Sequence, residues 1–123
     1  MILIVDDDES FAENCALLLE THGFSAEVAL DGFAAIKKIK ETHPELVISD
    51  CQMPKMTGME LNDILKEDPA TAQMPVLLMS AGLRRDTIGS SGCDGFLKKP
   101  FLAEKLLVEV ERLTSGKSLL VQN

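Results

Sequence analysis

Short apolar runs without a polar member recur along the chain and predict the strands of a parallel sheet. Residues 2–5, 46–48 and 76–79 are such runs, rich in Ile, Leu and Val, and each is followed by a small polar or acidic residue. A run with no polar face is typical of a strand that is buried on both sides. We expect two further strands, with a weaker pattern, at residues 25–30 and 95–98.

Between these runs, apolar residues recur at helical spacing. Ser10 can cap a first helix, and Gly23 lies just past its end. The apolar faces that we expect for four helices are Phe11, Cys15, Leu18 and Leu19; Phe33, Ile36 and Ile39; Met59, Leu61, Ile64 and Leu65; and Leu102, Leu106, Val110 and Leu113. Pro44, Pro69 and Gly116 mark where the last three end.

One more helix should lie between Gly82 and Gly92, although this segment is short and rich in Gly and Ser. Five strands alternating with helices imply a parallel sheet that is covered by helices on both faces. In such sheets, ligands bind beyond the carboxyl ends of the strands, where the strand order reverses. The residues that end or follow each strand are therefore the candidates for chemistry.

These strand-end residues say little one by one. The acidic run at residues 6–9 would favour the start of the next helix through the helix dipole. A single Asp at a strand end, such as Asp50, usually serves a turn or a helix cap. Ser80 at the end of the fourth strand and Lys99 after the fifth are equally ordinary alone. Their combination at one edge of a sheet is what predicts a site.

Three carboxylates meet if the first and third strands are neighbours. Asp6, Asp7 and Asp50 would then converge, and several carboxylates cannot all stay ionised at close range without a counter-charge. A divalent cation supplies that charge, and oxygen ligands favour Mg²⁺ or a similarly hard ion. Mg²⁺ takes few protein ligands and leaves positions for phosphate oxygens. The pattern therefore favours a phosphoryl-transfer site over a closed structural cage.

Phosphoryl transfer also needs a nucleophile, with positive or donor groups around the moving phosphoryl. Asp50 stands singly at a central strand end, so it is the best candidate nucleophile and would form an acyl phosphate. Lys99 can offer a positive charge and Ser80 a hydroxyl. The backbone N–H groups beyond Asp50 and Ser80, that of Cys51 among them, can donate further hydrogen bonds.

Composition narrows the class of protein. A chain of 123 residues suits one domain with one core. Its 20 acidic and 12 basic residues give a net charge of −8, which argues against direct binding to nucleic acid or a membrane surface. Three cysteines without metal or disulfide spacing favour a reducing cytoplasm. The first apolar run is too short for a signal peptide or a membrane span, so we expect a cytoplasmic protein.

The order of these motifs resembles the receiver domain of bacterial two-component response regulators, in particular the chemotaxis regulator, along almost the whole chain. The matching stretches are residues 2–8, 31–32, 46–50, 53–54, 58, 75–81 and 95–101. The resemblance implies a flavodoxin-like, doubly wound, five-stranded sheet in the order 2-1-3-4-5 with five flanking helices. It also implies a receiver domain over residues 1–115, followed by a tail or the start of a linker over residues 116–123.

The resemblance assigns roles at the acidic end of the sheet. Asp50 resembles the phosphoryl acceptor, and Asp6 and Asp7 resemble the acidic pair at the metal. The backbone carbonyl of Gln52 lies where the family completes the Mg²⁺ shell, together with the side chain of Asp50.

A switch is implied as well. Ser80 matches the hydroxyl residue that follows the phosphoryl group, and Lys99 matches the basic residue before a proline, in a cis peptide. Phe96 stands where the family has a switching aromatic. When Asp50 is phosphorylated, Ser80 would move toward it, and Phe96 would turn inward. The face formed by the fourth helix, fifth strand and fifth helix would then change shape.

We therefore expect a phosphoryl-accepting signalling module rather than an enzyme. It would take its phosphoryl group from a histidine kinase or a phosphotransfer protein, and an output domain or partner protein would read its state; homodimerisation stays open. A small Asp-nucleophile phosphatase is one alternative, but such enzymes usually carry a second Asp where this chain has Gln52. A phosphorylation-silent interaction module is the other, and the joint presence of the site residues argues against it.

Overall fold

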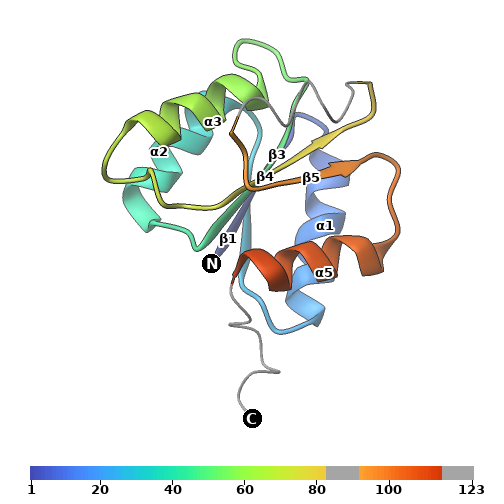
Figure 1. Ribbon diagram of the computed structural model, residues 1–123. Helices are drawn as coiled ribbons and strands as arrows, with labels where there is room; N and C mark the ends of the chain where they lie inside the picture. The colour runs from blue at the N-terminus through green and yellow to red at the C-terminus, as the bar shows by residue number, and fades with distance from the viewer. Residues whose placement is uncertain (83–91, 115–123) are drawn as a thin grey trace.

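The central sheet has the strand order β2-β1-β3-β4-β5, and all its strand pairs are parallel. The computed structural model in Figure 1 describes residues 1–82 and 92–114. Within these residues the strands are β1 (Ile2–Val5), β2 (Ala26–Ala29), β3 (Leu46–Asp50), β4 (Val76–Ser80) and β5 (Gly95–Lys98). Every residue of β1, β3 and β4 is buried, as the apolar runs predicted. The order implied by the resemblance is confirmed.

Helices cover both faces of the sheet (Figure 1). The described ones are α1 (Glu9–Thr21), α2 (Gly32–Thr42), α3 (Gly58–Glu67) and α5 (Ala103–Leu113). Helices α1 and α5 lie on one face, and α2 and α3 lie on the other. The helix expected between Gly82 and Gly92, and the tail at residues 116–123, fall outside the described part of the chain.

Two apolar clusters result, one under each helix layer. Because successive strand residues point to opposite faces, β1 gives Ile2 and Ile4 to the cluster that includes residues of α1 and α5. Leu3 and Val5 belong to the second cluster, which includes residues of α2 and α3. No helix within residues 1–82 and 92–114 is long and apolar enough to cross a membrane.

Side-chain caps fix where α1 and α2 begin. The prediction that Ser10 caps the first helix is wrong, because the Oδ1 atom of Asp8 accepts the backbone N–H of Phe11 at 3.1 Å, so α1 begins earlier. Asp31 caps α2 in the same way, accepting the N–H of Ala34 at 2.8 Å. Each acidic cap also places negative charge at the positive end of a helix dipole.

Three predicted core positions are instead exposed. Phe33 is 58% exposed, Ile64 is 40% exposed and Leu102 is 67% exposed. Helix α2 buries Ile39 as predicted, and it buries Gly32 and Ala35 in place of Phe33. A Cβ atom on Gly32 would lie only 2.5 Å from the sulfur of Met56, so α2 approaches that residue through a glycine. The helix faces were predicted from large apolar residues, so buried positions occupied by small residues were missed.

Strand β5 is fastened where it begins. The carboxylate of Asp94 accepts hydrogen bonds from Lys66 Nζ at 2.8 Å and from the backbone N–H of Val76 at 2.9 Å. The guanidinium of Arg112 donates to the Asp94 carbonyl at 3.1 Å. Residues of α3, β4 and α5 therefore hold the point at which the chain enters its last strand.

Candidate functional site

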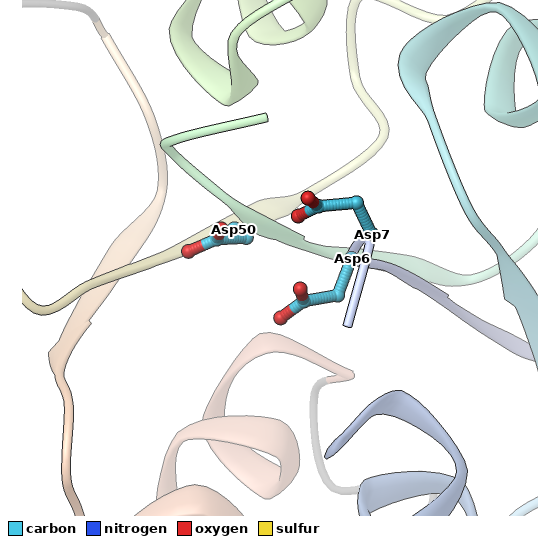
Figure 2. Close-up of side chains that lie close together, drawn as sticks. All are labelled: Asp6, Asp7 and Asp50. Atoms are coloured by element: carbon cyan, nitrogen blue, oxygen red, sulfur yellow. The ribbon is translucent and has the colours of Figure 1, made fainter. Parts of the chain in front are cut away.

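Three carboxylates converge at the carboxyl end of the sheet. Asp6 and Asp7 follow β1, and Asp50 is the last residue of β3, the neighbour of β1. One ligand oxygen from each lies within 4.8 Å of the others (Figure 2). This spacing fits a group of oxygen ligands around one hard cation, because each carboxylate can offer an oxygen to the same point. The structure thus brings together the acidic residues that the sequence singled out.

These carboxylates differ in their surroundings. Asp6 is 1% exposed, and its Oδ1 accepts the backbone N–H of Asp8 at 2.9 Å. Asp50 is 7% exposed, whereas Asp7 is open to solvent. The cluster is therefore buried on the Asp6 side and open on the Asp7 side, where a phosphodonor could approach.

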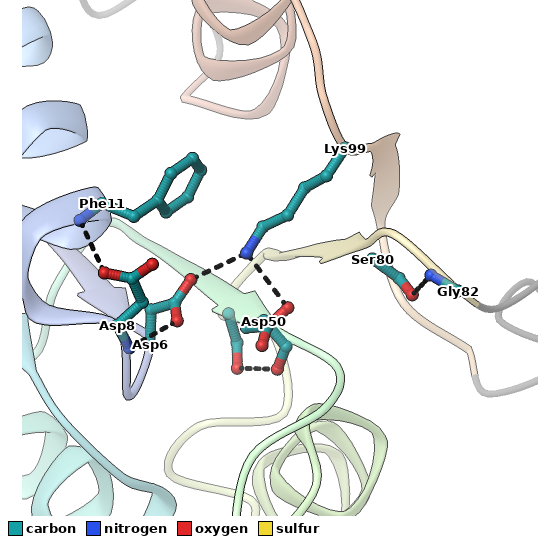
Figure 3. Close-up of polar contacts among 8 residues, drawn as sticks. Asp6, Asp8, Phe11, Asp50, Ser80, Gly82 and Lys99 are labelled. Carbon is teal, nitrogen blue, oxygen red and sulfur yellow. Dashed lines mark hydrogen bonds and ion pairs between the residues drawn. The ribbon is translucent and has the colours of Figure 1, made fainter.

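Lys99 supplies the positive charge that the sequence predicted. Its Nζ atom lies 3.0 Å from Asp6 Oδ2 and 3.3 Å from Asp50 Oδ1 (Figure 3). The peptide bond between Lys99 and Pro100 is cis, as expected. The backbone N–H of Lys99 donates to the carbonyl of Ser80 at 2.9 Å, so the ends of β4 and β5 are joined at the site.

The charges and the burial of the cluster change the pKa of both Asp50 and Lys99. Burial raises the pKa of the Asp50 carboxyl above its ordinary value, and the charge of Asp6 raises it further, while Lys99 acts in the opposite direction. Burial lowers the pKa of Lys99, but the hydrogen bond and charge of Asp6, together with Asp50, outweigh burial and raise it overall. One ammonium among three carboxylates leaves an excess of negative charge.

The burial of Asp50, together with this excess charge, predicts a pH-dependent stability. Because the folded, metal-free protein holds the Asp50 proton to higher pH than the unfolded chain, the free energy of unfolding falls as the pH rises between the two pKa values. We expect Asp50→Asn to be more stable than wild type at neutral pH without divalent ions, by about 1 kcal/mol. The difference should shrink as the pH falls to about 4. Urea denaturation in EDTA at both pH values measures it, and a less stable variant at neutral pH would contradict it.

The hydroxyl and aromatic residues lie on the neighbouring strands. Ser80 ends β4 and is fully buried, and its Oγ accepts the N–H of Gly82 at 3.2 Å (Figure 3). Phe96 on β5 is partly buried and packs against the cluster beneath α2 and α3. Gln52 is exposed, and its side-chain amide lies beside Gly82, where an added Cβ would be 3.3 Å from the amide nitrogen.

Sequence reasoning was wrong about one backbone donor and missed one contact. The N–H of Cys51 donates to the carbonyl of Met79 at 2.8 Å, so it continues the β3–β4 pairing and does not face the site. Lys99 Nζ lies 4.2 Å from the ring centroid of Phe11, a residue assigned only to the apolar face of its helix. No local pattern predicted this second contact, because the sequence shows only that Phe11 lies in the first turn after the acidic run.

The family is shown by comparison with known proteins. A family model described as the response regulator receiver domain matches residues 2–111, so this chain belongs to that family. Its receiver fold places it in two-component signalling, where receiver domains are typically signalling domains rather than enzymes.

Two solved structures show how close the fold is. A receiver domain of a signal transduction histidine kinase from Syntrophus aciditrophicus is 37% identical, with a TM-score of 0.86 over 94% of this chain and 90% of that one. The chemotaxis protein CheY4 of Vibrio cholerae is 30% identical, with a TM-score of 0.84 over 91% of this chain and 96% of that one.

The relatives found by sequence differ in length. The DNA-binding dual master transcriptional regulator RpaA of Synechocystis is 35% identical over 115 residues, which are 91% of this chain but 48% of RpaA. Protein PilG of Pseudomonas aeruginosa is 33% identical over 109 residues, which are 86% of this chain and 81% of PilG. This chain thus spans about half the length of RpaA and most of the length of PilG.

Proposed function

We propose that this receiver domain stores a signal as a phosphoryl group on Asp50. The observation that carries the proposal is the meeting of Asp6, Asp7 and Asp50 within 4.8 Å of one another, with the Lys99 ammonium between Asp6 and Asp50. A carboxylate with a raised pKa, beside an ammonium and two further carboxylates, is an environment suited to acyl-phosphate chemistry.

Mg²⁺ is the cation that this donor set fits best. The carboxylates of Asp6, Asp7 and Asp50 would hold it, and the backbone carbonyl of Gln52 would complete the protein's share of the ligands. When bound, Mg²⁺ supplies neutralising charge to the carboxylates and to the oxygens of the transferring phosphoryl group. Nitrogen and sulfur ligands are absent from this group of three side chains, which disfavours zinc.

Each residue of the site has a separate role in the transfer of the phosphoryl group. An oxygen of Asp50 attacks the phosphorus of a phosphohistidine, the P–N bond breaks, and the electron pair of that bond returns to the imidazole. Lys99 moves from the carboxylate of Asp50 to an oxygen of the new phosphoryl group, while it keeps its bond to Asp6. Ser80 turns its hydroxyl toward the same group, and Phe96 follows inward as the switch.

The partners follow from this chemistry. A histidine kinase or phosphotransfer protein supplies the phosphoryl group, and an output domain or a partner protein reads the altered surface. RpaA is named as DNA-binding, but the net charge of −8 argues that this domain does not itself contact nucleic acid or a membrane. We place the protein in the cytoplasm, where such donors act. Because Gln52 stands where Asp-nucleophile phosphatases usually carry a second Asp, we propose a switch rather than a phosphatase.

Beryllofluoride, which mimics a phosphoryl group, tests the proposal without a kinase. With Mg²⁺, it should shift the backbone amide NMR signals of Ser80 and Lys99 in wild type and leave those of Asp50→Ala in place. Asp63→Ala, which removes an exposed carboxylate from α3, is the matched control and should respond like wild type. Unshifted wild-type signals, or a response that survives Asp50→Ala, would overturn the assignment of Asp50.

A further inference from the structure

The ammonium group of Lys99 has a third neighbour besides its two carboxylates. Its Nζ atom lies 4.2 Å from the ring centroid of Phe11, within the range of a cation–π contact. In Figure 3 the ring lies on the α1 side of the ammonium, away from Asp50. The side chain of Lys99 is 20% exposed, so it is partly withdrawn from water, and the attraction to the ring is stronger than at a fully exposed site.

The ring of Phe11 is itself held in place. The Phe101 ring meets it in a T-shaped contact, with centroids 6.0 Å apart and planes at 77°. The backbone N–H of Phe11 is bound by the cap residue Asp8 at 3.1 Å. Phe11 therefore joins the first turn of α1 to the segment that follows Lys99, with its backbone fixed by Asp8 and its ring packed against Phe101.

A neutral ring has a different effect on Lys99 than a third carboxylate would have. It attracts the ammonium without adding negative charge to a cluster that already carries an excess. It also does not compete for the hydrogen bonds that Lys99 must exchange when Asp50 gains a phosphoryl group. A lysine without this contact could swing its flexible four-carbon side chain toward solvent, at the cost of its bond to Asp50.

We propose that Phe11 is a positioning residue for phosphoryl transfer: its ring holds the Lys99 ammonium between Asp6 and Asp50, where the arriving phosphoryl group needs it. This inference rests on the proposed function, in which Asp50 accepts that group. It predicts that the rate of phosphorylation depends on the electron density of the ring face, and not only on an apolar side chain at this position.

The test measures the rate constant for labelling of Asp50 by acetyl phosphate and Mg²⁺ in the full chain. Phe11→Leu keeps an apolar side chain but removes the ring, and we expect the rate constant to fall about fivefold to tenfold. Phe24→Leu is the matched control, because Phe24 belongs to the same apolar cluster and is 8% exposed. It should leave the rate constant within about twofold of wild type.

Two further measurements separate positioning from packing. Phenylalanines with one, two and three ring fluorines at position 11 keep the shape of the ring but withdraw density from its face, so the rate constant should fall step by step. In a Lys99→Met background, Phe11→Leu should have no further effect, because the ring has lost its cation.

The contact can also be followed without phosphorylation. In wild type, the ring current of Phe11 should shift the ε-methylene proton signals of Lys99 upfield, and Phe11→Leu should abolish this shift. If Asp50 is labelled in wild type but neither Phe11→Leu nor fluorination slows labelling, the inference is overturned and the proposed function stands. If wild type is not labelled on Asp50 while the ring-current shift is present, the proposed function fails and the inference fails with it.

Discussion

Asp50→Asn is expected to abolish phosphoryl labelling of this protein by acetyl phosphate and Mg²⁺, with a loss of about 100-fold or more in the labelling rate. An amide oxygen is a poor nucleophile, so it cannot replace the carboxylate in attacking phosphorus. The substitution also removes one negative ligand from the cluster with Asp6 and Asp7. The fold should survive, because Asn has nearly the same shape and relieves the repulsion from Asp6.

Mass spectrometry of the intact protein after exposure to the phosphodonor measures this loss. The same change at an exposed carboxylate, Asp63→Asn on α3, is the control and should be labelled as fast as wild type. Peptide mapping of the labelled wild type should place the added mass on the peptide that contains Asp50. Full labelling of Asp50→Asn at another residue would remove Asp50 from its role.

Gly58→Ala is expected to destabilise the protein by about 2–4 kcal/mol and to slow phosphorylation as well. A Cβ atom on Gly58 would lie 2.3 Å from the carbonyl oxygen of Asp50 and 3.0 Å from the Cα of Cys51. These are backbone atoms, which cannot rotate away as a side chain can. The N–H of Gly58 also donates to the Cys51 carbonyl at 3.0 Å, so α3 would have to leave the end of β3.

Gly82→Ala is the matched control for this change. Among the described residues, the nearest atoms to an added Cβ there belong to the flexible side-chain amide of Gln52, at 3.3 Å. We expect its effect on the free energy of unfolding to stay within about 0.5 kcal/mol. Urea denaturation of both variants decides the matter. Equal stability of Gly58→Ala and wild type would mean that α3 can shift at no cost.

The three central strands of the sheet could be predicted because they obey one simple rule. A strand that is buried on both faces contains apolar residues throughout, and residues 2–5 and 76–79 follow this pattern without exception. The convergence of Asp6 and Asp50 then followed from parallel pairing, which brings the carboxyl ends of neighbouring strands to one edge. The strand order itself came from the resemblance to receiver domains rather than from the pattern.

The buried face of α2 and the contact between Phe11 and Lys99 could not be predicted from the sequence. Gly32 and Ala35 are small, so their buried positions carried no hydrophobic signal, while the bulky Phe33 suggested a face that is in fact exposed. The contact between Phe11 and Lys99 joins residues that are far apart in the chain, and it depends on how α1 sits over the sheet. No local pattern encodes such a distance.

Strand β5 is held in place at both of its ends. Asp94 is held where the strand begins, by Lys66 and Arg112, and Lys99 is held just beyond its end, by the Ser80 carbonyl and by Asp6. These contacts tie the position of Lys99 to α3, α5, β4 and Asp6 rather than to the length of the chain between Ser80 and Asp94. A change of length in this segment is therefore expected to leave Lys99 beside Asp50, and with it the phosphorylation chemistry.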